Sequence, residues 1–550
     1  MNDGLRLYLS HFKNGTSPVF KFCEYLNISV CPPTETNNFS VMVHNPIGRA
    51  STEVLSFPVF GTDFEVLDSS AHPIPSQVVP VSSATKSVRR YRGNATHNLV
   101  WSANLPGLGG AVFFIQPKHS RGKYASELSK VFVPPKLDDF SIENQALKLT
   151  FSGLTGRLKT MFNKHSNITV AVDQNLLWWR AKSGNFSVQP SGAYIFSPDG
   201  ILPHTISPLS LVNTSIVNGS LVQEVRQQWS SWAYQTVKLY SNLPIAIFEY
   251  TIGPIPYEDK VGKEVVSRFT TDLKSNATWY TDSNGREMQK RIRNYRPTWK
   301  WYDSEPVAGN YYPVPSRIYI RDEDHGVQLT VLTDRAQGGS SLKDGELELM
   351  VHRRLFDDDG KGLDEALNEP GQFGDGLIVR GSHYVILDNF NNSTLCHRLL
   401  GEKLLLKSQP FISTFPVSPS EWMAKFPTQY SGLARDLPPN VHLLTLERLD
   451  HTHHLLRLEH QFQSNEQPYN NTVTVQLADL FTTMKVVDVV ELGLGANAAL
   501  SDIHRLHWNT ESHGAKGRYQ SAEAKMKSPF IVELKPMEIH TFNITVEYTI

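Results

Sequence analysis

The feature that most restricts the fold of this chain is an unbroken succession of strand-like segments. From about residue 139 to residue 435, runs of alternating branched and aromatic residues follow one another, among them NITVAV, YQTVKLY and VQLTVLT. The pattern indicates no amphipathic helix of ten residues between them. So many consecutive strands are typical of large antiparallel sheets packed face to face. The sequence therefore predicts an all-β fold of successive antiparallel β-sandwich domains, one of them a large super-sandwich.

Two joints divide this β pattern, and a chain of 550 residues is long enough for three or four domains. Polar and Pro-rich segments interrupt the strands near 119–138 and near 435–440. Ahead of the first strand, apolar residues at helical spacing predict a short N-terminal helix that looks like the tail of a longer helical region. We expect the following domains: 1–21, the end of that helical region; 22–135, a small β-sandwich; 136–438, the large super-sandwich; and 439–550, a C-terminal β-sandwich.

The charge balance restricts the partners of the chain. It carries 53 basic and 54 acidic residues, a formal net charge of -1. Nucleic acids and anionic membrane surfaces are bound through a basic excess, so neither is an expected partner. No run of eighteen apolar residues is present, so no membrane-spanning helix is expected.

Cysteine and sequon usage points to the secretory pathway. Cys23 and Cys31 bracket an Asn-x-Ser sequon at Asn27, one of thirteen Asn-x-Ser/Thr sequons along the chain. Some of them can arise by chance in a sequence rich in Asn, Ser and Thr. The opening stretch MNDGLRLYLS contains no apolar signal run. We expect glycosylation at Asn27, Asn38, Asn94, Asn276 and Asn543.

A bond between Cys23 and Cys31 would impose a geometric condition. Bridged Cα atoms lie about 5.5 Å apart, so the chain would have to reverse near Tyr25–Asn27. The apolar residues that follow at every second position predict a half-buried strand leaving this turn, with Asn27 on its polar side. The third cysteine, Cys396, is either buried and free or paired with another chain.

Two motifs resemble ligand sites but have plainer interpretations. GGSSLKDG, residues 338–345, follows no strand-to-helix pattern, so a tight loop is favoured over a phosphate-binding loop. HTHHLLRLEH places several histidines close together, and a zinc pair is conceivable. No carboxylate at suitable spacing completes that pair, so solvated edge histidines are favoured: His451, His453, His454 and His460.

Carboxylates and aromatic residues suggest sugar chemistry with equal ambiguity. Paired carboxylates could act on a glycoside, but an Asp- and Gly-rich charged turn is the favoured interpretation of Asp357, Asp358, Asp359, Asp364 and Glu365. Tyr and Trp present a flat face and a polar group that suit a sugar, as in LLWWR, TWKWY and GNYYPVP. For most of these aromatic residues, packing within the sheets is favoured.

From residue 22 onward, long stretches resemble the zinc-dependent retaining glycoside hydrolases known as class II α-mannosidases, in particular their lysosomal members. The stretches that carry the resemblance are SGAYIFSP, GPIPYEDKVGKEVVSRF, YTDSNGREMQKR, EPVAGNYYPVPSRIYI, LTVLTDRAQGGSSLKDGELELMVHRRL, DDDGKGL, RDLPPNVHLLTL and LKPMEIHTF. The resemblance covers the end of the family's helical bundle and its β domains. It implies a disulfide between Cys23 and Cys31.

The resemblance also implies where the chemistry lies. In complete family members, His and Asp side chains hold a zinc ion, and two Asp residues serve as nucleophile and acid/base. All of these correspond to sequence upstream of Met1, so the resemblance implies no catalytic or zinc-binding residue in this chain and no signal peptide. It further implies that a tyrosine of GNYYPVP touches the mannose, and Tyr311 and Tyr312 are both candidates.

The resemblance thus implies the C-terminal β portion of a lysosomal α-mannosidase, which hydrolyses terminal α-D-mannose residues of glycoprotein oligosaccharides. Its expected partners are the N-terminal catalytic half and a mannose-containing oligosaccharide, and a homodimer is compatible with it. The expected compartment of the complete enzyme is the lysosome lumen. Two alternatives stay open: a stand-alone carbohydrate-binding β-sandwich protein without hydrolase activity, and a fragment that does not fold alone.

Overall fold

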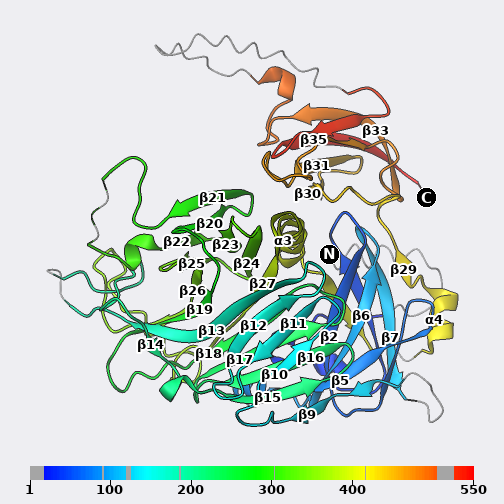
Figure 1. The fold of residues 1–550 in the computed structure, drawn as a ribbon. Helices are drawn as coiled ribbons and strands as arrows, with labels where there is room; N and C mark the ends of the chain where they lie inside the picture. The colour runs from blue at the N-terminus through cyan, green and yellow to red at the C-terminus, as the bar shows by residue number, and fades with distance from the viewer. Residues whose placement is uncertain are drawn as a thin grey trace, which may run out of the picture.

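The computed structural model describes residues 18–89, 92–118, 125–184, 188–300, 302, 304–414, 417–503 and 526–549. The short helix expected within 1–17 and the sequons at Asn14 and Asn185 lie outside the described residues. Three bodies of strands are visible in Figure 1, two side by side and the C-terminal one above them. The all-β prediction is confirmed, because the described α-helices are α2 (Ser83–Arg89), α3 (Phe390–Leu405) and α4 (Pro419–Lys425). None of these helices is both long and apolar enough to cross a membrane.

The first sandwich encloses a core between two small sheets. Phe57 and Trp101 of one sheet stack 5.3 Å apart, and Phe113 of the other sheet lies 6.0 Å from Trp101. One sheet has the order β28 (Gln409–Ser413), β1 (Phe39–Asn45), β7 (Gly109–Pro117), β3 (Phe64–Leu67) and β4 (Pro73–Ile74), with β29 (Gln429–Tyr430) on β7. The other has β2 (Ser51–Val59), β6 (His97–Leu105), β5 (Ser76–Pro80) and β8 (Glu127–Leu128).

The chain returns to this first sandwich after the large one. Strand β28 pairs with β1, Ile412 facing Val41, although more than 360 residues separate them. Helix α4 begins at a capping box in which Ser418 and Glu421 bond each other's backbone, and its Trp422 packs edge-on against Phe114 of β7. Sequence alone does not show this return, which takes place within the expected 136–438 range. The domain limits stay a prediction.

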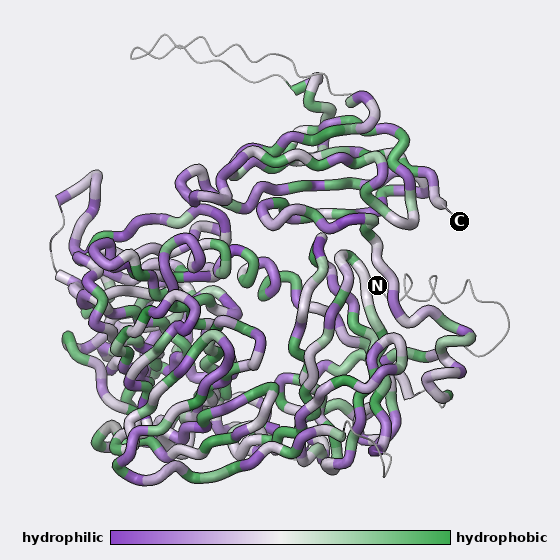
Figure 2. The backbone as a smooth tube through the Cα atoms, turned by 45° about the vertical axis from the view of Figure 1, so that its right-hand side comes forward, coloured by the Kyte–Doolittle hydropathy of each residue, from purple (hydrophilic) through white to green (hydrophobic). Residues whose placement is uncertain are grey.

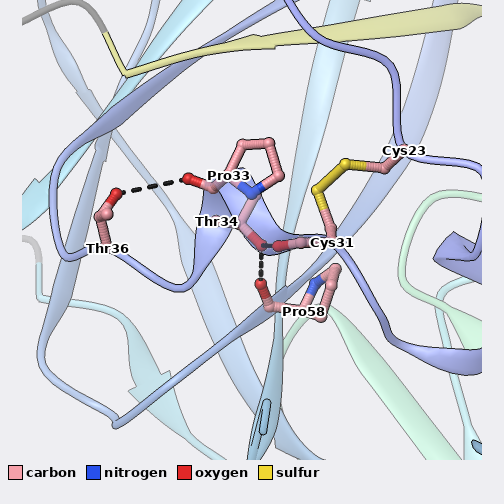
Figure 3. Close-up of a disulfide and its surroundings, with 6 residues drawn as sticks. All are labelled: Cys23, Cys31, Pro33, Thr34, Thr36 and Pro58. Carbon is pink, nitrogen blue, oxygen red and sulfur yellow. Dashed lines mark hydrogen bonds between the residues drawn. A yellow bond between two sulfur atoms is a disulfide. The ribbon is translucent and has the colours of Figure 1, made fainter. Parts of the chain in front are cut away.

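The two cysteines close a short loop whose disulfide is buried against the core of the first sandwich (Figure 3). Cys23 and Cys31 are disulfide-bonded, with Cα atoms 5.3 Å apart, and the reversal is confirmed. The half-buried strand expected after it is wrong: Leu26–Ile28 is a 3-10 turn, and Ser29 has a φ of 56°. Reversing within eight residues leaves no room for a strand. The buried Thr34 hydroxyl then ties this disulfide loop to the carbonyl of Pro58 on β2.

The large sandwich stacks a nine-stranded sheet on a ten-stranded one. The nine-stranded sheet has the order β10 (Phe140–Glu143), β11 (Leu147–Phe151), β12 (Leu158–Asn163), β13 (Ile168–Arg180), β19 (Lys263–Thr271), β26 (Glu346–Arg354), β25 (Gln337–Ser340) and β22 (Tyr312–Val314), with β14 (His204–Thr205) on β13. The ten-stranded sheet has β21 (Glu287–Ile292), β20 (Thr278–Ser283), β23 (Arg317–Asp322), β24 (Val327–Thr333), β27 (Val379–Asn389), β18 (Ala246–Ile252), β17 (Ala233–Tyr240), β16 (Val222–Gln228), β15 (Asn213–Asn218) and β9 (Lys130–Phe132).

The core of the large sandwich follows from the alternation that the sequence shows. On β17, every second residue from Ala233 to Leu239 is buried, while the residues between are half-exposed. Buried side chains of both sheets meet in one cluster, in which Phe248 and Phe269 pack edge-on at 5.3 Å. Figure 2 shows hydrophobic (green) and hydrophilic (purple) stretches alternating along the backbone. Burying each such side chain contributes roughly 1.5–3 kcal/mol.

Helix α3 contradicts the expectation that no helix of ten residues interrupts the strands. It runs for 16 residues behind an N-cap at Asn389, whose side chain accepts the Asn392 amide. Its fully buried residues are polar, and its last leucine, Leu405, is 75% exposed. Beside them, Cys396, Leu400 and Leu404 form a partly buried apolar row with a spacing of four residues that packs on the ten-stranded sheet. This helical spacing is present in the sequence, and the strand prediction overlooked it. The buried residues of α3 are Ser393, Thr394, His397, Arg398 and Glu402.

The C-terminal sandwich has its own core, including Leu456, Phe542 and Ile544. Its strands are β30 (Val441–Arg448), β31 (His453–His460), β35 (Ile539–Tyr548) and β33 (Met484–Leu492), faced by β32 (Val473–Gln476) and β34 (Ile531–Leu534). On β35, His540 Nδ1 lies 2.7 Å from the Glu491 carboxylate of β33. Its other ring nitrogen, Nε2, lies 3.5 Å from the Glu538 carboxylate. The hydrogen bond to Glu491 raises the pKa of His540 above its ordinary value.

We expect peptide mapping without reduction to recover Cys23 and Cys31 in one linked pair and Cys396 as a thiol. Burial raises the pKa of Cys396 to about 12, so alkylation should require unfolding. Replacing both paired cysteines with Ser should destabilise the first sandwich by about 2.5 kcal/mol in urea unfolding, because a short closed loop is lost. Cys396→Ser serves as the control. Recovery of Cys23 alkylated, or linked to Cys396, would contradict the assignment.

The raised pKa of His540 predicts a pH-dependent stability. A folded-state pKa above the ordinary 6.5 gives a contribution that is complete below pH 6.5 and lost as pH rises through the folded value. His540→Gln should therefore lower the melting temperature at pH 5.5 and have little effect at pH 8.5. The exposed His165 provides the control, since His165→Gln should change neither value. An equal loss at both pH values would refute the linkage.

Candidate functional site

Two carboxylates are completely buried in the middle of the nine-stranded sheet. Glu264 lies on β19 and Glu348 on β26, and both are 0% exposed. The antiparallel register places Arg268 opposite Glu348 and Arg353 opposite Glu264. Buried carboxylates are tolerated only when paired and hydrogen-bonded. The four charged residues thus form two pairs on neighbouring strands, and we name them the β19–β26 charge cluster.

Glu348 collects donors from three other elements. Arg268 Nε donates to its Oε2 at 2.7 Å, and Trp179 Nε1 of β13 donates to its Oε1 at 2.7 Å. The Tyr311 hydroxyl donates to the same Oε1. Burial, together with the Glu348 carboxylate, raises the pKa of Tyr311 well above its usual range. The phenol therefore stays protonated and remains a donor.

Glu264 anchors a loop that carries the SGAYIFSP stretch. Arg353 donates to Glu264 Oε1 from Nε at 2.9 Å and from Nη2 at 2.6 Å, and Ser191 donates to Oε2 at 3.2 Å. Arg353 Nη2 also donates to the Ile195 carbonyl at 2.8 Å. Burial raises the pKa of Glu264 against the opposing effect of Arg353. One arginine thus joins the buried carboxylate to the loop above it.

The predicted Asp cluster has a structural member in the same place. Asp359 is buried, and its Oδ2 accepts the backbone amides of Tyr194 at 2.6 Å and Ile195 at 2.9 Å. A Cβ added at Gly192 would lie 2.5 Å from Asp359 Cβ, so this contact requires glycine. Although burial opposes it, hydrogen bonding to these amides lowers the pKa of Asp359. The charged-turn interpretation fits this arrangement, and Asp359 acts in it as a clamp on the loop.

The two candidate tyrosines lie on opposite sides of their strand. The Tyr311 ring packs at 4.7 Å edge-on to Phe196, on the side of the charge cluster. Tyr312 faces the other way, with Trp279 edge-on at 5.8 Å. The Arg291 guanidinium lies over the Tyr312 ring at 4.3 Å, and Arg296 lies 5.2 Å from its centre. Neighbouring extended residues point to opposite faces, so only one of the pair reaches the charge cluster.

The GGSSLKDG stretch differs from its expected loop. Its first residues belong to β25, which pairs with β22 so that Gly338 faces Pro313 and Gly339 faces Tyr312. A Cβ at Gly338 would lie 3.3 Å from the Tyr311 ring, and one at Gly339 would lie 2.7 Å from Val314. Because Gly338 and Gly339 have no side chains, β22 can approach β25 closely. The turn follows only after Ser340.

The clustered histidines have separate partners. His453 Nδ1 lies 2.8 Å from the Asp450 carboxylate, and His454 packs edge-on to Tyr548. His460 Nε2 lies 3.0 Å from the Asn471 carbonyl, while the exposed His451 bonds Arg448. Across the described ranges, no group of three or more His, Cys, Asp or Glu side chains is placed to hold a metal ion. The described residues therefore do not fit the zinc site that the resemblance implies for complete enzymes.

The predicted glycosylation sites differ in exposure. Asn27, Asn38, Asn94 and Asn276 are exposed, and Asn543 on β35 is half-buried. Sequence reasoning missed the β19–β26 charge cluster altogether. Its signal was present as charged residues inside apolar strands, in KEVVSRF and ELELMVHRR. Such residues need partners, but the sequence did not say which.

The comparisons with known proteins agree on one family. Residues 142–361 match the glycosyl hydrolases family 38 C-terminal domain, and residues 440–542 match the family 38 C-terminal beta sandwich domain. Lysosomal alpha-mannosidase of Felis catus is 41% identical over 97% of this chain, and that of Homo sapiens is 41% identical over 96%. Alpha-mannosidase of Canavalia ensiformis is 37% identical over 95%.

The same comparisons show how much of these relatives the chain represents. It covers 51% of the cat and human proteins and 55% of the Canavalia protein, so it spans about half their length. A crystal structure of an alpha-mannosidase from Enterococcus faecalis V583 shares the fold, with a TM-score of 0.58 at 12% identity over 94% of this chain and 57% of that one. The chain belongs to glycoside hydrolase family 38 and corresponds to the C-terminal β portion of its class II α-mannosidases.

Proposed function

We propose that this chain is the β portion of an α-mannosidase that removes terminal α-D-mannose from glycoprotein oligosaccharides in the lysosome lumen. Named relatives support the activity and the compartment. The observation that carries the proposal is the convergence of the stretches that resemble the family. Five of these stretches meet at the β19–β26 charge cluster and the loop it holds: SGAYIFSP, KEVVSRF, GNYYPVP, MVHRRL and DDDG.

The hydrolytic step requires groups that we expect on an N-terminal catalytic half. Retaining hydrolysis uses two carboxyl groups about 5 Å apart. Glu264 and Glu348 are unsuited to that role, because each is occupied by an arginine and by neutral donors. Metal binding by His and Asp ligands has no matching group in the described residues. The role of this chain is therefore to support the catalytic half and to form one wall of its cleft.

Tyr311 is the residue through which this wall would reach the sugar. Its hydroxyl donates to Glu348, which leaves the phenol oxygen able to accept a hydrogen bond from a sugar hydroxyl. Glu348 is fixed by Arg268 and Trp179, so the phenol is held in one position. Tyr312 is covered by Arg291 and packs on the core, which suits a structural role.

Exposed aromatic residues near the same end suit a docking surface for the catalytic half. Trp299 is 65% exposed, Tyr302 is 73% exposed and Tyr194 is 65% exposed. Tyr194 follows Gly192 in the loop that Asp359 holds. Exposed aromatic side chains are typical of protein interfaces, where they supply large rigid contacts.

The purified 550-residue chain alone should not hydrolyse an aryl α-mannoside between pH 4 and pH 7, with or without added zinc. Co-expression with the N-terminal half of a lysosomal family member should restore zinc-dependent turnover, because that half supplies the carboxyl groups and metal ligands. Release of the chromogenic aglycone measures the activity of the chain alone and of the two halves together. Zinc-dependent hydrolysis by the chain alone would overturn the proposal.

In the reconstituted enzyme, Tyr311→Phe should lower kcat/KM by roughly fivefold, the factor supplied by a hydrogen bond worth about 1 kcal/mol. Tyr312→Phe is the matched control and should leave kcat/KM unchanged, because its ring contacts with Arg291 and Trp279 remain. The melting temperatures of both variants show whether either loses its fold. The reverse order of effects would assign the sugar contact to Tyr312.

A further inference from the structure

A third buried carboxylate lies beside the β19–β26 charge cluster. Glu346 stands two residues before Glu348 on β26, so both side chains point to the same face of the nine-stranded sheet. Glu346 is 3% exposed. The register with β19 places Thr270 opposite Glu346 and Arg268 opposite Glu348. The guanidinium of Arg268 therefore has a buried carboxylate on each of two neighbouring positions of β26.

The two carboxylates share Arg268 unequally. Arg268 Nε donates to Glu348 Oε2 at 2.7 Å, and its Nη2 pairs with the same oxygen. From Glu346 Oε1, the same Nε lies 3.6 Å away, beyond hydrogen-bond distance. That Oε1 atom is buried and has no hydrogen-bond partner among the residues that the structure describes. Glu348 is thus fully bonded, whereas Glu346 keeps one buried oxygen without a donor.

The remaining charges around Glu346 do not supply that donor. Glu348, on the same strand, repels it, while Lys343 in the turn before β26 and Arg293 after β21 attract it from a distance. Lys343 is exposed, and Arg293 lies 2.7 Å from the Asp344 carboxylate. Against these cations, burial raises the pKa of Glu346 above its ordinary value. A proton taken up by the two glutamates is therefore held on Glu346.

The charge on Glu346 decides how Arg268 is shared. A protonated Glu346 leaves the guanidinium to Glu348, whose other oxygen accepts the Tyr311 hydroxyl. An ionised Glu346 competes for the same guanidinium, and a movement of about 0.5 Å would bring Arg268 Nε within hydrogen-bond distance of it. Any such movement draws Arg268 away from Glu348 and loosens the group that holds Tyr311.

We propose that Glu346 is a positioning residue for Tyr311. In its protonated form it leaves Arg268 to Glu348, and the phenol is held in place. In its ionised form it competes for Arg268, and the phenol is held less firmly. This positioning depends only on contacts within the chain. Its effect on turnover rests on the function proposed above, in which Tyr311 touches the sugar.

Thermal unfolding of the full chain tests the positioning without any turnover. Tyr311→Phe removes a donor to Glu348, so it should lower the melting temperature of the large sandwich by about 2 °C at pH 4 and by less than about 1 °C at pH 7.5. In the Glu346→Gln background, which cannot ionise, the loss should be equal at both pH values. Glu533 is exposed on β34, and the Glu533→Gln background is the matched control that should keep the difference.

Glu346→Gln by itself should change stability in one direction. Because the folded-state pKa lies above the ordinary 4.5, the wild-type chain loses stability as pH rises from 4.5 through the folded value. Glu346→Gln should therefore leave the melting temperature unchanged at pH 4 and raise it at pH 7.5. If this variant does not fold, Glu346→Met, of similar volume, takes its place.

The reconstituted enzyme tests the consequence for turnover. The ratio of kcat/KM for Glu346→Gln to that of the wild type should be about one at pH 4 and rise to roughly threefold at pH 7. Groups on the catalytic half titrate in both proteins and cancel in this ratio. In the Tyr311→Phe background the ratio should stay level, because the effect passes through the phenol.

The positioning is overturned if Tyr311→Phe costs the same at both pH values in the wild-type background, or if Glu346→Gln leaves the difference intact. A rise in the activity ratio that persists in the Tyr311→Phe background would overturn the path through the phenol. An inactive reconstituted enzyme would count against the function proposed above, and the thermal result would then decide on Glu346 alone.

Discussion

The burial of two carboxylates in the nine-stranded sheet is the constraint on which the candidate site depends. An ionised group loses its hydration there, and only a paired, fully bonded arrangement makes this tolerable. Glu348 recruits Arg268, Trp179 and Tyr311, and Glu264 recruits Arg353 and Ser191. Each of these hydrogen bonds holds the segment that carries the donor close to the buried carboxylate. Electrostatics inside the sheet therefore fixes the loops outside it.

This dependence makes the charges that hold the loops hard to replace. Arg353 holds the Ile195 carbonyl, and Asp359 holds the amides on the same loop, so replacing either charge would release the loop as well as unpair a buried group. Replacing Arg353 with Lys would not conserve the geometry, because Arg353 makes bonds in two directions from one planar group.

Sequence reasoning predicted the layers because alternation is a local property. The regular burial along β17 could be read directly from YQTVKLY. Helix α3 escaped because its apolar row is short, with only Cys396, Leu400 and Leu404 packed on the core. Its fully buried residues are polar or charged. The return of β28 to β1 escaped for another reason, since pairing over such a distance leaves no local signal.

The candidate site was predictable to the same limited extent. GNYYPVP marked the right strand, but the choice between Tyr311 and Tyr312 depends on which side meets Glu348, 37 residues from Tyr311 in sequence. Periodicity assigns the two tyrosines to opposite faces and cannot say which face carries the charges. In the disulfide loop, the resemblance implied the pairing of Cys23 with Cys31, but only the structure revealed the 3-10 turn of Leu26–Ile28.

The contacts between the sandwiches follow the same physical rule as the site. Helix α3 presents Glu402 to Arg49 of the first sandwich and Arg398 to Glu466 of the C-terminal one, the latter pair at 2.8 Å. Nearby, Arg286 bonds Glu459 at 2.5 Å, and His442 lies 3.1 Å from the same carboxylate. Although burial opposes it, the His442 hydrogen bond and Arg286 lower the pKa of Glu459.

A lowered pKa keeps this carboxylate ionised as the medium becomes acidic, where an unpaired glutamate would begin to take up protons. A junction built from apolar contacts would be indifferent to pH, whereas one built from ordinary exposed ion pairs would weaken in acid. Because Glu459 is paired with Arg286 and His442, this contact keeps its charge to lower pH than an exposed ion pair would. Helix α3 joins the large sandwich to both of its neighbours through two further buried ion pairs, Glu402 with Arg49 and Arg398 with Glu466.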